Sequence, residues 1–139
     1  MKLSTRSRYG VRMMLDLARH YAEGPIQLRK IAERQKISVK YLEQIIIPLK
    51  KARFVSSIRG PKGGHMLAVS PRELTIGQIV EVLEGAMCFS ACALDDKACQ
   101  MSSKCSIRAL WVEATKLVYE KLNSVSLLEL VGSDDDRLC

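Results

Sequence analysis

Apolar side chains recur at helical spacing through the first third of the chain. Their period predicts a helix over about Thr5–Glu23, a second over about Leu28–Gln35, and a third that follows Ser38 as its N-cap. The third helix has apolar residues at the spacing i, i+3, i+4 and i+7, namely Leu42, Ile45, Ile46 and Leu49. Because only Lys36-Ile37 separates the second and third helices, the pair is predicted to be a helix-turn-helix.

Two short apolar runs follow the third helix on either side of a glycine-rich loop. We expect strands at Phe54–Ile58 and His65–Val69, and the loop Arg59–Gly64 contains three glycines and one proline. A hairpin directly after a helix-turn-helix is typical of a wing. The predicted fold is therefore mainly α with a small β-hairpin wing, and residues 1–72 are predicted to form a winged helix-turn-helix domain.

A short helix and an irregular segment come next. A capping-box pattern at Thr75 and Gln78 precedes a predicted helix over about Ile76–Leu83. From there to Cys105 the sequence has no helical or strand period. Residues 73–105 are therefore predicted to be a connecting helix and a cysteine-rich loop.

A long helix is expected over about Ser106–Leu122, with a stripe of residues at the spacing of a coiled coil. The stripe consists of Ile107, Leu110, Trp111, Ala114, Leu117, Val118 and Lys121. Because the first domain has a core of its own, we expect the stripe to meet that of a second copy, which makes the chain a homodimer. Packing within one subunit is the alternative. A capping box at Ser126 and Glu129 precedes a last apolar turn, and residues 106–139 are predicted to be a dimerisation helix and a polar C-terminal tail.

The distribution of charge favours a polyanionic partner for the first domain. The chain of 139 residues has a net charge of +7, and residues 1–72 hold 16 Lys and Arg against four Asp and Glu. Residues 73–139 instead hold six basic and 11 acidic residues. Such asymmetry is typical of proteins that bind nucleic acid or an anionic membrane surface, and a merely solvated basic face is the alternative.

The sequence also argues against several classes of protein. The N-terminus lacks the apolar core of a signal peptide, and no apolar run approaches the roughly 20 residues that cross a bilayer. We therefore expect a cytoplasmic protein without a membrane partner, in a compartment where thiols stay reduced. Because we find no Ser/His/Asp set, phosphate loop or paired-carboxylate site, we expect no enzyme and no small-molecule substrate. His20 and His65 are expected to be structural or solvated.

The N-terminal end of the third helix carries side chains that suit double-stranded DNA. A glutamine can bond adenine at two atoms, a serine can bond several bases, and a glutamate can accept from cytosine N4. Cations beside the glycines of the hairpin loop suit a minor groove or a phosphate. The expected DNA-contacting residues are Ser38, Lys40, Tyr41, Glu43, Gln44, Arg59 and Lys62. An ordinary surface helix and hairpin is the alternative.

Four of the five cysteines lie in the predicted loop and form the candidate metal site. Cys88, Cys92, Cys99 and Cys105 are separated by three, six and five residues. The absence of a C-x-x-C pair disfavours structural zinc, whereas soft thiolates on a long loop suit an iron–sulfur cluster. The alternative is a set of free thiols, although the polar neighbours of these cysteines are unsuited to a buried core.

Four segments together resemble the IscR/NsrR type of bacterial winged-helix transcription regulators. They are Leu3–Val11, Ile37–Gln44, Val55–Gly64, and Cys105 followed by Ala109-Leu110-Trp111. The runs Ser-x-x-Tyr-Leu-Glu-Gln and Arg-Gly-Pro-x-Gly-Gly are specific in combination. The resemblance covers about residues 1–131, which is nearly the whole chain.

The resemblance implies a homodimer on a palindromic operator, with base and groove contacts from the third helix and from Arg59. It also implies a cluster bound by three cysteines just before the dimerisation helix, here Cys92, Cys99 and Cys105. Members of this type use the cluster to report cluster supply, iron, nitric oxide or redox state, and some members have no cluster.

The chain departs from this type at the fourth cluster ligand. The IscR type has a histidine three residues after the last cysteine, where this chain has Arg108, and the NsrR type has an N-terminal acid, where it has Arg8. The gap between Cys92 and Cys99 is also one residue longer than in the IscR type. The open candidates for the fourth donor are Cys88, an oxygen donor such as one from the partner subunit, and an exogenous small thiol.

The sequence leaves the cluster type and two other functions open. A [2Fe–2S] cluster is preferred over [4Fe–4S], because the first helix and the Ala-Leu-Trp segment look more like the IscR type. One alternative is a cluster-free regulator of the same fold that senses through a reactive thiol, either Cys92 or Cys99. The other is an iron–sulfur carrier protein with an incidental basic half.

Overall fold

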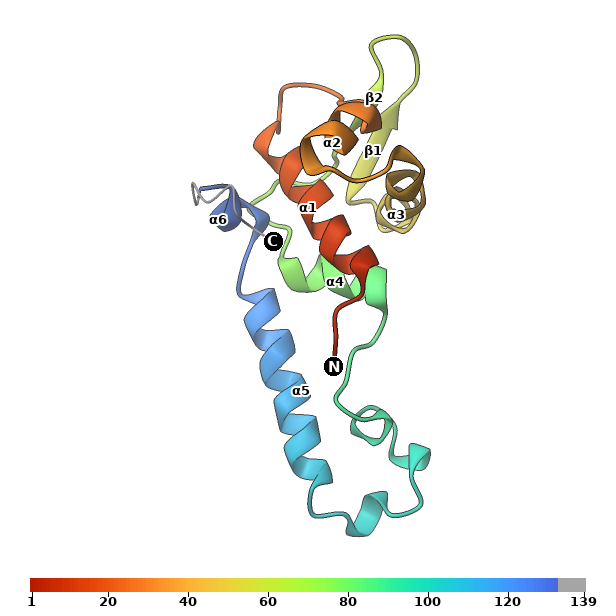
Figure 1. Ribbon diagram of the computed structural model, residues 1–139. Coiled ribbons are helices and arrows are strands. Elements are labelled where there is room, and N and C mark those ends of the chain that lie inside the picture. The colour runs from red at the N-terminus through yellow and green to blue at the C-terminus, as the bar shows by residue number, and fades with distance from the viewer. Residues whose placement is uncertain (133–139) are drawn as a thin grey trace.

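A computed structural model describes residues 1–132, which fold into six α-helices and one two-stranded hairpin (Figure 1). The helices are α1 (Thr5–Arg19), α2 (Leu28–Gln35), α3 (Val39–Lys51), α4 (Ile76–Glu84), α5 (Arg108–Asn123) and α6 (Leu127–Val131). The strands are β1 (Val55–Ile58) and β2 (Gly64–Leu67). The predicted polar tail after Gly132, with Cys139 at its end, lies outside the described residues.

The elements divide into two regions (Figure 1). Helices α1–α4, the hairpin and α6 lie together at one end, and we call residues 1–84 with α6 the head. Residues 85–107 lead away from the head, and helix α5 runs back toward it beside them, so that together they form a long arm. We call residues 85–125 the stalk. None of the helices described over residues 1–132 combines the length and apolar character needed to cross a membrane.

Helix α1 runs through the centre of the head. Ser4 caps its start, because the Ser4 Oγ accepts a hydrogen bond from the Ser7 backbone N–H at 3.2 Å. Met13 and Met14 are fully buried in the core. A Cβ at Gly10 would clash with the Leu83 side chain, so the glycine lets α1 and α4 approach closely.

The helix-turn-helix is confirmed, and α2 has the predicted bounds. Lys36 takes a left-handed conformation (φ 57°) that ends α2, and Ile37 is buried beneath the turn. The Ser38 Oγ accepts from the Tyr41 N–H at 3.2 Å, which caps the start of α3 as predicted. The four apolar residues at helical spacing on α3 are all buried.

Helix α1 is shorter than predicted, since it ends at Arg19 and not near Glu23. The chain folds back through a turn in which the Tyr21 N–H donates to the Ala18 carbonyl at 3.2 Å. Ala22 is left-handed (φ 68°), a conformation that a right-handed helix cannot contain. The apolar spacing continues into this turn, but the helical backbone ends before it.

The wing is confirmed as an antiparallel hairpin. Strand β1 begins one residue later than predicted, and β2 begins one residue earlier and ends two residues earlier. Val55 pairs with Leu67 and Ile58 pairs with Gly64. The Ile26 N–H donates to the His65 carbonyl at 2.8 Å, and the His65 N–H donates back to the Ile26 carbonyl at 2.7 Å. A short bridge from the segment before α2 therefore fixes the wing to the head.

The second half of the chain begins with α4 in the head, passes through the stalk, and ends with α6 in the head. The Thr75 Oγ accepts from the Gln78 N–H at 3.2 Å, which confirms the capping box of α4. Helix α5 starts two residues later than predicted, and its far end meets α4, where the Ile76 N–H donates to the Val125 carbonyl at 2.9 Å. The α6 residue Leu127 is fully buried, so the chain rejoins the core of the head after the stalk.

Candidate DNA-binding surface and cysteine loop

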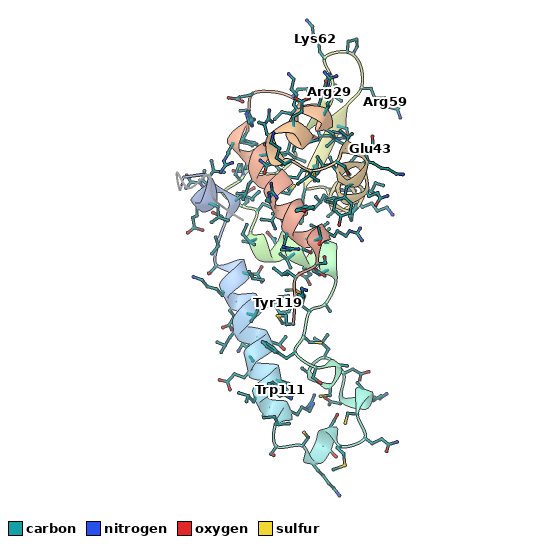
Figure 2. The ribbon with its side chains drawn as sticks, in the orientation of Figure 1. Arg29, Glu43, Arg59, Lys62, Trp111 and Tyr119 are labelled. Carbon is teal, nitrogen blue, oxygen red and sulfur yellow. The ribbon has the colours of Figure 1, made fainter. Side chains whose placement is uncertain are left out.

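Three of the residues predicted to contact DNA lie at the end of the head that carries the hairpin. Figure 2 shows Glu43 of α3 and Arg59 and Lys62 of the hairpin at this end, with Arg29 of α2 nearby. Six of the seven predicted residues are exposed, and Tyr41 is half-buried. Glu43, Arg59 and Lys62 thus lie far from Trp111 on the stalk (Figure 2).

An open groove of about 450 Å³ separates α3 from the wing. Of the predicted residues, only Glu43 and Arg59 line it. Ser38 and Tyr41 instead line a second hollow of about 410 Å³ between α3 and α1. The other lining residues of the first groove are Gln27, Leu28, Lys50, Ser57, Ile58, Gly60, Gly63, Gly64 and His65. Three elements, α2, α3 and the wing, thus build one concave surface.

Two of the predicted contact residues also have structural tasks. The Tyr41 ring packs edge to face against Tyr9, with centroids 5.8 Å apart, and the Arg12 guanidinium lies 5.4 Å from the Tyr9 centroid. The Ser38 hydroxyl accepts the capping bond of α3, but its own hydrogen can still be donated to a base or phosphate. Tyr41 offers DNA only its polar tip, because its ring helps to fix α3 against α1.

The start of α2 is a feature of the groove that the sequence analysis missed. Gln27 is the N-cap of α2, but its side chain makes no capping hydrogen bond. The first backbone N–H groups of α2 therefore lack a side-chain cap, and a helix N-terminus of this kind attracts phosphate. A glutamine before a helix is a weak sequence signal, since serine, threonine, aspartate and asparagine are the common caps.

His65 was expected to be structural or solvated, and it lines the same groove. Burial, and then the charge of Lys50, lower the pKa of His65 below its ordinary value of 6.5. The imidazole is therefore neutral at pH 7. Its Nδ1 is buried and has no hydrogen-bond partner in the described part of the chain. Its place in the groove depends on the bridge to Ile26, which no local pattern predicts.

A buried carboxylate holds the helix-turn-helix against α1. Asp16 is only 2% exposed, and it accepts hydrogen bonds of 3.0 Å from the Arg34 Nε and from the Gln35 Nε2. The hydrogen bond to Asp16 raises the pKa of Arg34. Arg12 also donates to the Gln35 backbone carbonyl. These contacts fix the position of α2, and with it the position of the groove.

The cysteine loop follows α4 and contains three short 3-10 turns, at Ala91–Ala93, Asp96–Ala98 and Ser102–Lys104. The thiols of Cys88, Cys92, Cys99 and Cys105 are all free; Cys99 is exposed and the others are half-buried. Over residues 1–132 no three cysteine, histidine or acidic side chains lie close enough to hold a metal ion. The structure thus places the four predicted ligands in one loop but does not bring them together.

The loop is attached to α5 by ring and backbone contacts. The Met87 N–H donates to the Tyr119 hydroxyl at 2.6 Å, and the Phe89 N–H donates to the Thr115 hydroxyl at 3.4 Å. The Phe89 and Trp111 rings stack with centroids 6.3 Å apart. Figure 2 shows Trp111 and Tyr119 spaced along α5. A movement of the loop therefore acts directly on α5.

Arg108 stands where the IscR type has its fourth ligand, and its side chain holds the loop. The Arg108 Nε donates to the Cys92 backbone carbonyl at 2.7 Å, and a second guanidinium nitrogen pairs with the Asp96 carboxylate. A guanidinium has no lone pair for a metal. The soft thiols of the loop suit an iron–sulfur cluster chemically, but its fourth donor must come from another group.

The apolar stripe of α5 faces partly toward the cysteine loop and partly toward solvent. Leu110 and Leu117 are 51% and 57% exposed, while Trp111 is half-buried against the loop. Exposed leucines at this spacing are typical of a helix that packs on another chain. Part of the predicted stripe thus packs within the subunit, and the rest has no partner in the described residues.

Comparisons with known proteins cover both regions. A family model described as Rrf2, iron-dependent transcriptional regulator, matches residues 3–133. The chain is 42% identical over 139 residues to protein rrf2 of Nitratidesulfovibrio vulgaris, a match that covers 100% of this chain and 91% of the relative. It is 38% identical over 135 residues to the HTH-type transcriptional regulator IscR of Aliivibrio salmonicida, which covers 97% and 80% of the two chains.

A solved structure is similar over the same extent. The structure of CymR (YrzC), named the global cysteine regulator of B. subtilis, matches with a TM-score of 0.78 and 38% identity. The match covers 94% of this chain and 96% of that one. It confirms the predicted fold, which is mainly helical with a hairpin wing.

Proposed function

This chain belongs to the Rrf2 family of transcriptional regulators, and we propose that it binds a palindromic operator as a homodimer under the control of an iron–sulfur cluster. Its winged helix is a DNA-binding domain, as expected from its HTH-type relatives, which are regulators and not enzymes. It acts in the cytoplasm, on duplex DNA. The observation that carries the proposal is the groove in which Glu43 of α3 faces Arg59 of the wing.

The proposed complex places α3 in the major groove and the wing beside the adjacent minor groove. The exposed side chains of Ser38, Glu43 and Gln44 then meet base edges, while Lys40 lies beside them and suits a phosphate. The DNA backbone enters the groove between α3 and the wing, where Lys50 and the uncapped start of α2 favour phosphate. Arg59 and Lys62 extend this cationic surface along the hairpin.

Dimerisation is supported by the exposed leucines of α5. Covering Leu110 and Leu117 with a second copy of α5 removes apolar surface from water, which contributes roughly 25 cal/mol per Å². The helix lies at the far end of the molecule from the wing (Figure 1). The operator is proposed to be a palindrome because the two-fold symmetry of a dimer repeats the same contacts on two half-sites.

The cluster is proposed to be held by Cys92, Cys99 and Cys105, with Cys88 as the candidate fourth ligand. The family's description as iron-dependent supports this assignment, and [2Fe–2S] is the preferred type. When bound, the cluster supplies chemistry that responds to iron, cluster supply, redox state or nitric oxide. The chain's own part is to hold the loop on α5 through Arg108 and Trp111, so that a change in the loop reaches the dimer interface.

A second candidate is a cluster-free regulator that senses through a thiol. The observations that favour it are the likeness to CymR and the exposed thiol of Cys99. Both candidates share the fold and the DNA-binding surface. They differ in the state of the loop cysteines, which bind iron in the first candidate and act as a reactive thiol in the second.

Selection of bound sites from a random duplex library tests the DNA-binding part of the proposal. We expect the full-length protein to enrich a palindrome and to bind it at least about 1,000-fold more tightly than a scrambled duplex. The affinity is expected to fall steeply with salt, because phosphate contacts release counterions. No enrichment, or equal affinity for both duplexes, contradicts the proposal.

An absorption spectrum of protein purified without oxygen tests the cluster. We expect visible absorption that is lost in Cys92→Ser, Cys99→Ser and Cys105→Ser, while Cys139→Ser serves as the control outside the loop. If Cys88→Ser keeps the wild-type spectrum and cluster stability, Cys88 is not the fourth ligand. A colourless protein from iron-replete cells contradicts the cluster and favours the thiol-sensing candidate.

A further inference from the structure

The cysteine loop contains a small hollow whose residues are suited to a charged ligand. It measures about 160 Å³ and is lined by Asp96, Cys99, Gln100, Ser102, Ser103 and Arg108. On this measure a single water needs only roughly 10–15 Å³, so the hollow has room for a small ligand such as one amino acid. The lining contains a cation, an anion, two hydroxyls, an amide and a thiol.

Ser102 is the observation that points to a ligand. Its side chain is only 9% exposed, and its Oγ has no hydrogen-bond partner among residues 1–132. A buried hydroxyl without a partner is unfavourable, because the group has given up its bonds to water. A polar ligand in the hollow offers this hydroxyl the bond that the chain itself does not provide.

The two charged residues of the hollow, Arg108 and Asp96, indicate the chemistry of that ligand. Arg108 uses one nitrogen on the Cys92 carbonyl and another on Asp96, and a guanidinium has five N–H donors, so donors remain for a carboxylate. Asp96 is exposed and has a second oxygen, which suits an ammonium group. A cation and an anion side by side fit a zwitterionic amino acid.

We propose that this hollow binds one half of an amino-acid disulfide of the cystine type and directs it to Cys99, which becomes S-thiolated. The Cys99 thiolate attacks one sulfur of the disulfide, the S–S bond breaks, and the other half leaves as a thiolate. One disulfide is exchanged for another, so no further oxidant is needed. The inference deepens the second candidate function, in which the chain senses through a thiol. It concerns the metal-free protein, and its test needs neither DNA nor a cluster.

The test compares three disulfides that share the reacting bond. Reduced, metal-free, full-length protein is treated with cystine, with cystamine, which lacks carboxylates, or with dithiodipropionate, which lacks ammonium groups. Mass spectrometry of peptides then gives the rate of mixed-disulfide formation at each cysteine. We expect Cys99 to react at least tenfold faster with cystine than with cystamine, and dithiodipropionate to fall between them. Cys88, outside the hollow, is expected to show no such preference.

Three variants identify the groups responsible. Arg108→Gln is expected to abolish the preference for cystine, and Ser102→Ala to lower the cystine rate several-fold with the cystamine rate unchanged. Ser102→Ala leaves the bonds from Arg108 to the loop intact, so it separates ligand binding from loop folding. Lys104→Gln removes a neighbouring cation that does not line the hollow, and the preference is expected to persist. Equal rates for the three disulfides at Cys99, or loss of the preference in Lys104→Gln, overturn the proposal.

Discussion

The head and the stalk are built from similar residues but use them differently. In the head, Met13, Leu42 and Ile79 are fully buried in one core. In the stalk, Leu110 and Leu117 remain more than half exposed on a regular helix of 16 residues. The difference indicates that the head has a core of its own, whereas α5 keeps exposed the leucines that we propose to pack on a second copy.

Polar contacts follow the same division. In the head, Asp16 is buried and accepts from Arg34 and Gln35, so removing it leaves its partners without their acceptor. In the stalk, the Arg108–Asp96 pair is largely exposed on the Asp96 side, and exposed ion pairs typically contribute less than about 1 kcal/mol. The buried pair in the head is therefore expected to contribute more to stability than the exposed pair in the stalk.

The largest expected effect is on the stalk interface. Replacing both Leu110 and Leu117 with Asp puts charges where a second copy of α5 is proposed to pack, and we expect a monomer by light scattering. Because linked half-sites gain about 100-fold or more in affinity, operator binding is expected to fall by at least that factor. Lys116→Asp reverses a charge on the same helix, outside the predicted apolar stripe, and is expected to leave the dimer intact. A double variant that remains dimeric would move the interface elsewhere.

The next effect separates base reading from general attraction in the head. Gln44 is exposed on α3, and a base-edge contact contributes about 1–3 kcal/mol of discrimination. Gln44→Ala is therefore expected to weaken operator binding about tenfold or more while binding to a random duplex stays unchanged, as measured by fluorescence anisotropy. Equal losses on both duplexes would show that Gln44 does not read a base.

A smaller effect is expected from the wing. Arg59 lines the groove opposite Glu43, and Arg59→Ala is expected to cost more than about 1 kcal/mol of binding and to lower the salt slope by about one. Arg72→Ala removes an exposed cation outside the groove and is expected to change neither quantity. The proposed role of the wing fails if the affinity and slope of the Arg59 variant match those of the wild type in a salt titration.

The smallest effect concerns pH and the head. The pKa of His65 is lower in the folded chain than its ordinary value of 6.5, so the unfolded chain binds the proton more tightly. The free energy of unfolding is therefore expected to fall as pH drops below 6.5, and His65→Gln should reduce this loss. The measurement is urea titration of the wild type and of His65→Gln at pH 7.5 and 5.5. An unchanged pH dependence in His65→Gln contradicts the assignment.

The sequence predicted some elements of the head better than others. Helices α2 and α3 were predicted well because their signals are local, such as the cap at Ser38 and the apolar spacing of Leu42 and Ile45. The end of α1 was predicted wrongly, because Ala22 fits the apolar period while its backbone is left-handed. Local patterns predict which elements form better than they predict where each one ends.

The sequence predicted which residues belong to the sites, but not how those residues are arranged with respect to one another. Glu43 and Arg59 were identified individually, but the groove between them also needs His65, which is placed by its pairing with Ile26. In the stalk, the contact of Arg108 with Cys92 joins residues 16 positions apart through an irregular loop. No period or spacing gives such contacts, because tertiary packing alone brings these residues together.

We propose that the cysteine loop of the stalk controls DNA binding by the head. The test is to measure operator affinity under anaerobic conditions before and after an iron chelator is added, in the wild type and in Cys105→Ser. We expect a severalfold change in Kd for the wild type and none for Cys105→Ser, which has lost a proposed ligand. The same Kd for the wild type before and after chelation, in protein whose visible absorption has disappeared, would show that the loop does not control DNA binding.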